Sequence, residues 1–446
     1  MKVALISPRE YERSKRFYFL HRVYRKLEKI VKFTWDDIEF SPNLGLLTIA
    51  AFIPRDWEIE YIDEDYITDM DEYDSILDKD FDLVCMTAVC TQVVRAYYLC
   101  DEFRKKGAVV CMGGWHASTI PEEVEPHVDS IIIGEGEDTF PVFLEDFKKG
   151  KVKKRYVSAG NFDLTKSPIP RYDLIKHIEF FNEIPVNITR GCPFKCSFCT
   201  VIDVYGNRYR HKTIEQVHKE LDTIKSLIKR PRIIFADENM LVNRKFSKEL
   251  LKSFIGAGIR YETFADISIA EDEELLELLY ESGCHTAFVG LESTRPDTLK
   301  KLSPFKLSKL DNYEDAIEII QSHGIKVIGS FIAGIDGDDY GIFKEIRDFG
   351  LKTNLYETGI LVLTPVPGTK IWDDYKEQGR LLDGYTNLVA MEFINYKPLG
   401  MTPMEIEKGM IWVHKELNNP KIANQRRAYF KKVWRNLLNK KGGFIK

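Results

Sequence analysis

The stretch "TRGCPFKCSFCT" (residues 189–200) places three cysteines, Cys192, Cys196 and Cys199, on one short loop after a predicted strand. Cysteine thiolates hold iron–sulfur clusters, and three thiolates on a cubane of four irons leave one iron open to bind another molecule. A zinc site needs a fourth ligand, and the nearest downstream histidine, His211, lies beyond the loop. The spacing therefore favours a cluster over a zinc site or a set of core cysteines.

This loop follows the first of six predicted β/α units. Six such units are typical of a partial barrel, whose active groups lie at the carboxyl ends of the strands. We predict a partial (β/α)6 barrel over residues 185–384, preceded by a linker at 151–184 and followed by a helical cap with a basic tail at 385–446. The predicted strands are 185–191, 232–238, 261–267, 285–292, 326–334 and 357–365.

The first 150 residues alternate β-rich runs with helical stretches, which predicts a doubly wound, Rossmann-like parallel sheet in an α/β fold. Its predicted strands are 2–7, 58–63, 82–88, 108–114 and 130–136. In such a sheet a ligand binds outside the carboxyl ends of the strands. The residues expected along that rim are Ser7, Asp63, Thr87, Gly113, Gly114, Gly134 and Gly136.

The composition is that of an ordinary globular protein, with 446 residues, 44% apolar residues and a net charge of -5. The small charge argues against a nucleic-acid partner. The sequence shows neither a signal peptide nor an apolar run long enough to span a membrane, so we expect a cytoplasmic protein whose clustered cysteines bind metal. Residues 421–446 carry nine Lys and Arg and no acid, which predicts either a docked terminal helix or a contact with anionic lipid or a partner.

The motif "GCPFKCSFC" resembles the cluster loop of the radical SAM superfamily. The resemblance implies a [4Fe-4S] cluster whose open iron binds the amino and carboxylate groups of S-adenosylmethionine (SAM). It also implies reductive cleavage of SAM to a 5'-deoxyadenosyl radical, with electrons from a flavodoxin or ferredoxin. "FADEN" (235–239) resembles the position that binds the SAM amino group, which makes Asp237 and Glu238 candidates, and Glu292 of "GLES" is a candidate for the ribose. "GSFIAG" (329–334) resembles the strand that packs on adenine.

The region 111–150 resembles the cobalamin-binding domains that precede radical SAM barrels, through "GGWHAS", "PEE" and "GEGE". The resemblance implies cobalamin as a cofactor. The histidine motif that places an imidazole on cobalt in other cobalamin proteins is absent, because the corresponding stretch is "SPREYERSK" (7–15). We therefore expect no histidine from that motif on cobalt. The candidate cobalamin contacts are Gly113, Gly114, His116, Gly134, Glu135, Gly136 and Glu137.

The first 150 residues contain four cysteines, Cys85, Cys90, Cys100 and Cys111. They raise the alternative of a second cluster, as in methylthiotransferases of the same superfamily. We expect Cys85, Cys100 and Cys111 to be small buried hydrophobes, since they lie in strands or a helix.

The resemblance implies cobalamin-dependent methyl transfer to an unactivated carbon of a small-molecule or lipid substrate. The open alternatives are a radical cyclisation, rearrangement or oxidation, a methylthiotransferase, and an iron–sulfur electron carrier. The sequence assigns no catalytic residue beyond the cofactor ligands.

Overall fold

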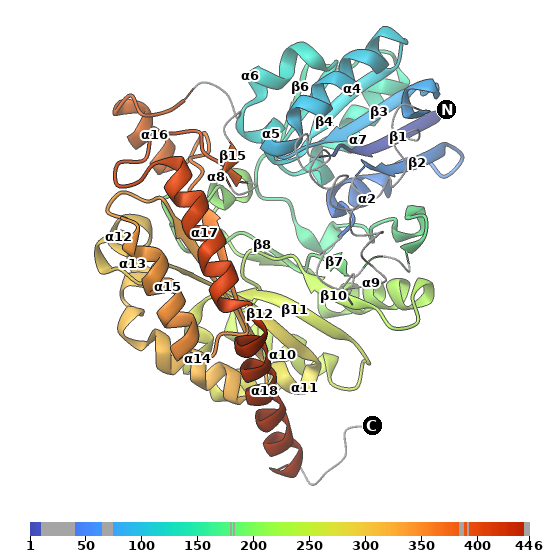
Figure 1. Cartoon of the computed structure of the whole chain (residues 1–446). Helices are drawn as coiled ribbons and strands as arrows, with labels where there is room; N and C mark the ends of the chain where they lie inside the picture. Colours follow the sequence, from blue (N-terminus) through green and yellow to red (C-terminus); the bar gives the residue numbers. More distant parts are fainter. Residues whose placement is uncertain are drawn as a thin grey trace, which may run out of the picture. The chain divides into compact units, whose positions relative to one another are not determined.

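The computed structural model (Figure 1) describes residues 1–9, 41–64, 75–178, 181, 183–382, 388–389 and 392–440. Most of the stretch 7–15 and residues 441–446 of the basic tail lie outside this range. The chain divides into two units. Unit 1 comprises Met1–Pro185 and Asp203–Pro231, and unit 2 comprises Val186–Ile202 and Arg232–Lys446.

Unit 1 contains a six-stranded parallel sheet in the order β2-β1-β3-β4-β5-β6. Residues 3–6 are fully buried, as expected for apolar strands covered on both faces. The predicted strands are confirmed, and β6 lies in the segment predicted as a linker. The strands are β1 (Lys2–Ser7), β2 (Glu58–Asp63), β3 (Leu83–Thr87), β4 (Val109–Gly113), β5 (Ser130–Ile133) and β6 (Arg155–Val157).

Helices cover this sheet. Ala96, Leu99 and Phe103 of α4 pack into one buried core with residues of β3 and β4. The helices of this part are α2 (Leu44–Ala50), α4 (Val93–Lys105), α5 (Gly114–Thr119), α6 (Pro121–Val124) and α7 (Gly136–Lys148).

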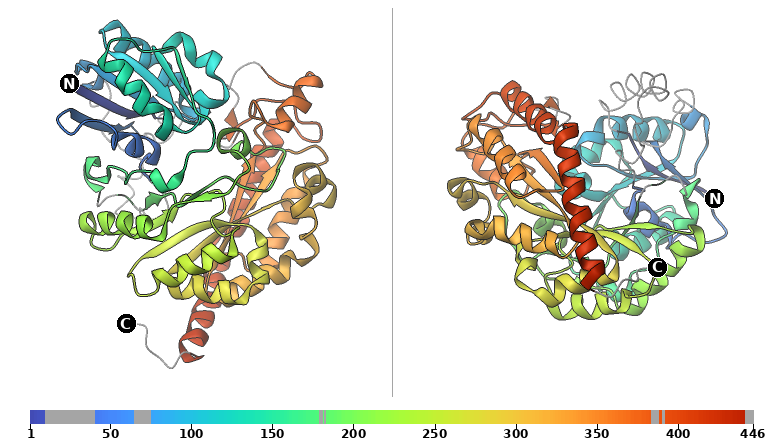
Figure 2. Two further views of the ribbon diagram at one scale, coloured as in Figure 1. Left: turned by 180° about the vertical axis from the view of Figure 1, so that it is seen from behind. Right: turned by 60° about the horizontal axis from the view of Figure 1, so that its bottom comes forward.

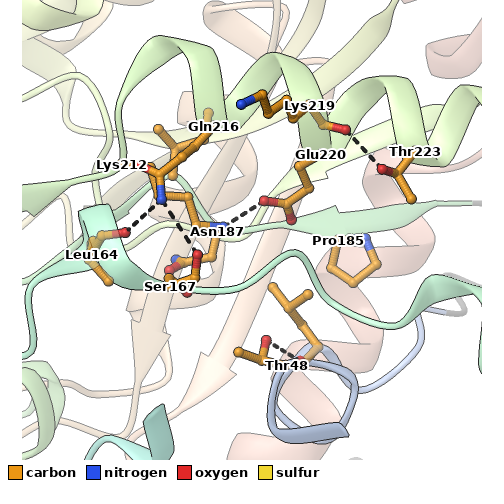
Figure 3. A network of polar contacts seen from close by, with 12 residues as sticks. Thr48, Leu164, Ser167, Pro185, Asn187, Lys212, Gln216, Lys219, Glu220 and Thr223 are labelled. Atoms are coloured by element: carbon orange, nitrogen blue, oxygen red, sulfur yellow. Dashed lines mark hydrogen bonds and ion pairs between the residues drawn. The ribbon is translucent and has the colours of Figure 1, made fainter. Parts of the chain in front are cut away.

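Helix α9 (Ile214–Leu227) packs in unit 1, although it follows the first predicted barrel strand. Glu220 on this helix pairs with Lys212 at 2.6 Å (Figure 3). It also accepts a hydrogen bond from the Tyr172 hydroxyl at 2.7 Å. The Gln216 side chain donates to the backbone oxygen of Thr165 at 2.8 Å. These bonds fix the segment after β6 to α9.

Unit 2 is built on a six-stranded sheet in the order β14-β13-β12-β11-β10-β7, with neighbouring strands in chain order, as the partial barrel requires. The strands are β7 (Ile184–Val186), β10 (Arg232–Phe235), β11 (Arg260–Ala265), β12 (Cys284–Glu292), β13 (Lys326–Ala333) and β14 (Glu357–Val362). Figure 2 shows the helices, coloured yellow to orange, along one side of this sheet. They are α10 (Arg244–Phe254), α11 (Glu273–Ser282), α12 (Pro296–Leu302), α13 (Pro304–Leu307), α14 (Tyr313–Ser322) and α15 (Gly341–Lys352).

The chain ends in the helices α16 (Lys370–Glu377), α17 (Pro403–Leu417) and α18 (Pro420–Lys440), with the short antiparallel strands β15 (Leu388–Val389) and β16 (Glu392–Phe393) between α16 and α17. Helix α18 is docked on unit 2. Phe430 is buried, Trp434 donates to the Gly324 oxygen at 3.0 Å, and Arg426 donates to the Tyr356 oxygen at 2.9 Å. Within the described residues, no helix is both long and apolar enough to cross a membrane.

Candidate functional site

The cysteine loop lies between β8 (Thr189–Arg190) and α8 (Val201–Tyr205) and is fixed from both sides. The Ser197 amide donates to the Leu302 oxygen at 2.9 Å, and the Ser197 oxygen accepts from the Ile371 amide at 3.0 Å. Phe194 stacks on Phe305 with ring centroids 4.0 Å apart. The loop is therefore held by the ends of α12, α13 and α16.

Cys192, Cys196 and Cys199 are partly buried free thiols. Burial raises the pKa of Cys192 to about 11, and it also raises the pKa of Cys199. The three thiols lie close enough together for the charge of a neighbouring thiolate to raise the pKa of Cys192 and of Cys199 further. Ligation to iron makes such thiols thiolates, because a coordinating thiol loses its proton. Among the described residues, no group of three His, Cys, Asp or Glu could hold a single metal ion. In a cubane cluster each thiolate binds its own iron, and three thiols on one loop suit such a cluster.

The carboxyl end of β10 carries both predicted carboxylates, in different surroundings. Asp237 is buried, and its Oδ1 accepts hydrogen bonds from the Thr189 amide and, at 2.9 Å, from the Ile188 amide. Burial raises the pKa of Asp237 to about 7. Glu238 is half-buried and its charge acts on the Cys192 thiol. Asp237 thus anchors the backbone before the cysteine loop, and Glu238 lies beside the loop.

Glu292 ends β12 at a bulge, with a positive φ of 65°. Its carboxylate forms a buried ion pair with Lys306 of α13. A Cβ on Gly290 would lie 2.5 Å from Lys306 Nζ and 2.6 Å from Glu292 Oε1, so the glycine makes room for this pair. The charges of Lys306 and Glu292 both act on Cys199. The structure therefore brings Glu292 and the cysteine loop together.

At the carboxyl edge of the unit 1 sheet, the chain passes from β4 directly into α5 at Gly113 and Gly114. The strand order of this sheet reverses between β1 and β3. In parallel sheets ligands bind at such a point, outside the carboxyl ends of the strands. Gly114 has a φ of +88°, and a Cβ there would lie 2.3 Å from Thr87 Oγ1. His116 is buried, with Nε2 2.9 Å from the Tyr97 hydroxyl. Gly114 thus lets the backbone turn closely past Thr87 at the end of the neighbouring strand, and the His116 ring is bonded inside the unit.

The "GEGE" motif follows β5. Gly134 has a φ of +81° and Gly136 begins α7. The Glu135 carboxylate is fully buried and paired with Arg210 at 2.8 Å, and Glu137 is buried within 3.4 Å of the Ser167 hydroxyl. The two glycines fit a cofactor loop, and the two carboxylates bind groups of the protein.

Residues 186–350 match the radical SAM superfamily, and residues 39–144 match the B12 binding domain. The chain belongs to the cobalamin-dependent radical SAM enzymes. It is 29% identical to bacteriochlorophyllide d C-8(2)-methyltransferase of Chlorobaculum tepidum, over 81% of this chain and 82% of that protein. It is 28% identical to hopanoid C-2 methylase of Rhodopseudomonas palustris, over 78% of this chain and 67% of that protein.

The fold is similar to that of the radical SAM methyltransferase TsrM from Kitasatospora setae, solved with cobalamin and a [4Fe-4S] cluster. The TM-score is 0.66 at 18% identity, and the match covers 93% of this chain and 85% of that one. TsrM therefore shares the fold of the present chain over most of its length.

Four of the five remaining cysteines of this radical SAM enzyme lie in unit 1, and the fifth, Cys284, is buried at the start of β12 in unit 2. Cys85 and Cys111 are register partners on β3 and β4, and both are buried, as is Cys100 on α4. Burial raises the pKa of Cys100 and of Cys111 far above the usual range of a thiol. These thiols have the environment of core hydrophobes, which speaks against a second cluster. Cys90 is half-buried, at the start of the turn before α4.

Sequence reasoning missed Lys306 and Arg210. Both are long-range partners of predicted site carboxylates, and neither belongs to a motif. His211, the alternative zinc ligand, has Nδ1 2.8 Å from the Lys212 oxygen. Only the three-dimensional pairing identifies Lys306 and Arg210 as parts of the two sites.

Proposed function

We propose that this radical SAM enzyme transfers a methyl group from SAM to an unactivated carbon of an apolar small molecule or lipid. The observation that carries the proposal is the presence in one chain of a three-cysteine loop beside Glu238 and Glu292, and of a sheet with glycine-lined rim loops. By function we divide the chain into residues 1–150, 151–184, 185–384 and 385–446. We place segment 203–231 structurally with unit 1.

In this proposal Cys192, Cys196 and Cys199 hold the cluster. Glu238 accepts the SAM ammonium, because a carboxylate forms a charge-assisted hydrogen bond with it, and Glu292 accepts from the ribose. Asp237 positions the loop by binding backbone amides instead of touching SAM. Cluster and cobalamin supply electron transfer, radical formation and methyl transfer when bound.

The rim glycines Gly113, Gly114, Gly134 and Gly136 would approach cobalamin through their backbone. His116, Glu135 and Glu137 are assigned positioning roles, because their side chains bind protein groups. We expect no histidine of the cobalt-binding motif on cobalt, because the sequence after β1 reads "SPREYERSK" (7–15).

The inner face of the barrel sheet supports an apolar substrate. Phe235 and Phe331 point to the opposite face, where they contact rings on α10 and α15. Side chains alternate along a strand, so Phe264, its register partner Phe288 and Leu361 share the inner face. Phe264 is 36% and Leu361 48% exposed, and the Phe264 and Phe288 rings stack at 5.0 Å. The two relatives are named for methylation of a bacteriochlorophyllide and of a hopanoid.

Anaerobic reconstitution with iron, sulfide and hydroxocobalamin tests the assignment. With titanium(III) citrate as reductant, the wild type should convert SAM to both 5'-deoxyadenosine and S-adenosylhomocysteine. Replacement of Cys192, Cys196 and Cys199 by alanine should abolish bound iron and 5'-deoxyadenosine. SAM cleavage by the triple variant would refute the cluster assignment. 5'-Deoxyadenosine without S-adenosylhomocysteine would favour a cyclisation, rearrangement or oxidation, and neither nucleoside would favour an electron carrier.

We place the enzyme in the cytoplasm, with a flavodoxin or ferredoxin as its reductant. Membrane contact through the tail would be electrostatic, since α18 uses Phe430 and Trp434 to dock on unit 2 and presents Arg427, Lys431 and Arg435 to solvent. Sedimentation with anionic liposomes should fall on deletion of residues 421–446. Absence of binding by the intact chain would contradict this contact.

A further inference from the structure

The segment after the cysteine loop, residues 203–211, packs with unit 1, whereas the loop itself packs with unit 2. Only a few residues separate the two. Asp203 follows Cys199 by four positions, and both Val201 and Asp203 belong to α8. The position of this segment therefore constrains the backbone that carries the third cluster ligand.

Arg210 holds the segment by a dense set of bonds. Its Nη1 lies 2.8 Å from both carboxylate oxygens of Glu135 and 2.8 Å from the Phe162 oxygen, while Nη2 donates to the Tyr205 oxygen at 2.9 Å. The Glu135 carboxylate also accepts from the Phe162 amide at 2.9 Å. The Glu135 side chain is fully buried and that of Arg210 is 9% exposed. One guanidinium thus ties the loop after β5 to α8.

Helix α5, which follows β4 directly, contacts the same segment. Trp115, which follows Gly114, meets the Tyr205 ring edge-on with centroids 5.4 Å apart. Both loops that we assign to cobalamin therefore hold the chain that leads back to Cys199. The two contacts, one from α5 and one from the loop after β5, restrict the orientation of α8 more than one contact could.

We propose that Arg210 is a positioning residue that couples the cobalamin loops to the cluster loop through residues 203–211. The inference rests on the proposed function and adds a link between the cobalamin loops and the backbone that carries Cys199. Formation of 5'-deoxyadenosine needs the reduced cluster, SAM and a hydrogen donor but no cobalamin, whereas S-adenosylhomocysteine from methyl transfer to reduced cobalamin needs SAM and cobalamin together. Loss of the Arg210 bonds should therefore lower the second product more than the first.

The test compares wild type, R210Q and R210K after reconstitution with iron and sulfide, with and without hydroxocobalamin. Hydrogen exchange of residues 201–211 should slow at least threefold on addition of hydroxocobalamin to the wild type and should be unchanged in R210Q. The ratio of S-adenosylhomocysteine to 5'-deoxyadenosine should fall at least tenfold in R210Q. R210K should lie between, because one ammonium cannot reproduce the guanidinium geometry.

K212M is the matched control. It breaks the neighbouring buried pair with Glu220 in the same unit, and neither residue bonds to Glu135 or Trp115 in the described structure. The ratio and the exchange response should match the wild type in K212M. If R210Q does not fold, R210K and E135Q are compared with the wild type in its place.

The inference is overturned if the Arg210 and Glu135 variants behave as K212M does while the wild type forms both nucleosides. A wild type that binds no hydroxocobalamin would instead overturn the proposed function, and this inference with it.

Discussion

Asp237 should make unit 2 less stable as pH rises, and D237N should remove this effect. The carboxyl is fully buried, and burial raises its pKa from 3.8 to about 7. The folded state therefore binds a proton that the unfolded state has lost between these two values, so the free energy of unfolding falls with rising pH across this window. A pKa near 7 in place of 3.8 corresponds to about 4 kcal/mol at pH 8.

Urea unfolding of the apoprotein is measured at pH 4, 5, 6, 7 and 8, with hydrogen exchange of peptides from β7 to β10 as the probe of unfolding. The difference between wild type and D237N isolates this residue, because other groups titrate in both proteins. Relative to D237N, the wild type should lose about 3–4 kcal/mol from pH 4 to pH 8, with a plateau above pH 8. Asn keeps an oxygen that accepts from the Ile188 and Thr189 amides, so the Asp237 variant retains the local backbone.

Parallel pH profiles for the two proteins would refute the reasoning, since they would show that Asp237 titrates alike in both states. D237A provides a second check. It leaves two buried amides without their acceptor, at a cost of about 1–3 kcal/mol each, and it should therefore destabilise unit 2 at every pH.

The remaining predictions concern the SAM site and the terminal helix. G290A places a Cβ 2.6 Å from Glu292 Oε1 and should cost about 3 kcal/mol of unfolding free energy in urea melts by opening the buried ion pair, whereas G359A, whose nearest contact is 4.0 Å away, should cost little. E238Q should raise the Kd for SAM about 10- to 100-fold in equilibrium dialysis, since a charge-assisted bond contributes about 1.5–3 kcal/mol; an unchanged Kd would exclude Glu238 as the ammonium acceptor. R426L removes the hydrogen bond from Arg426 to the Tyr356 oxygen, one of those that dock α18, so hydrogen exchange in this helix should rise at least tenfold; wild-type protection would show that the remaining contacts of the helix suffice.

The order of the elements could be predicted from the sequence because apolar runs such as "KVALIS" mark buried parallel strands locally. Strand ends were less accurate. The strand predicted over 232–238 ends at Phe235, because the next residues turn so that Asp237 can bind backbone amides of the neighbouring segment. Such a turn depends on a partner about 49 positions away, which periodicity does not encode.

The cysteine spacing was informative because its meaning is local, and three ligands on one loop need no knowledge of the fold. Glu135 and His116 illustrate the opposite case. Their motifs mark the correct loops, but the direction of each side chain depends on Arg210 and Tyr97, which belong to other elements. A motif therefore locates a cofactor loop more reliably than it assigns the side chains within it.

The buried Glu135–Arg210 pair is poorly explained by stability alone. Removing two charges from water is costly, and apolar residues of similar volume often stabilise a protein as well or better. A guanidinium has a fixed donor geometry, however, and here it satisfies a carboxylate and two backbone oxygens from three separate segments. An apolar contact could fill the same space without specifying the orientation of α8. We therefore infer that the pair constrains the geometry of residues 203–211, which follow Cys199 in the chain.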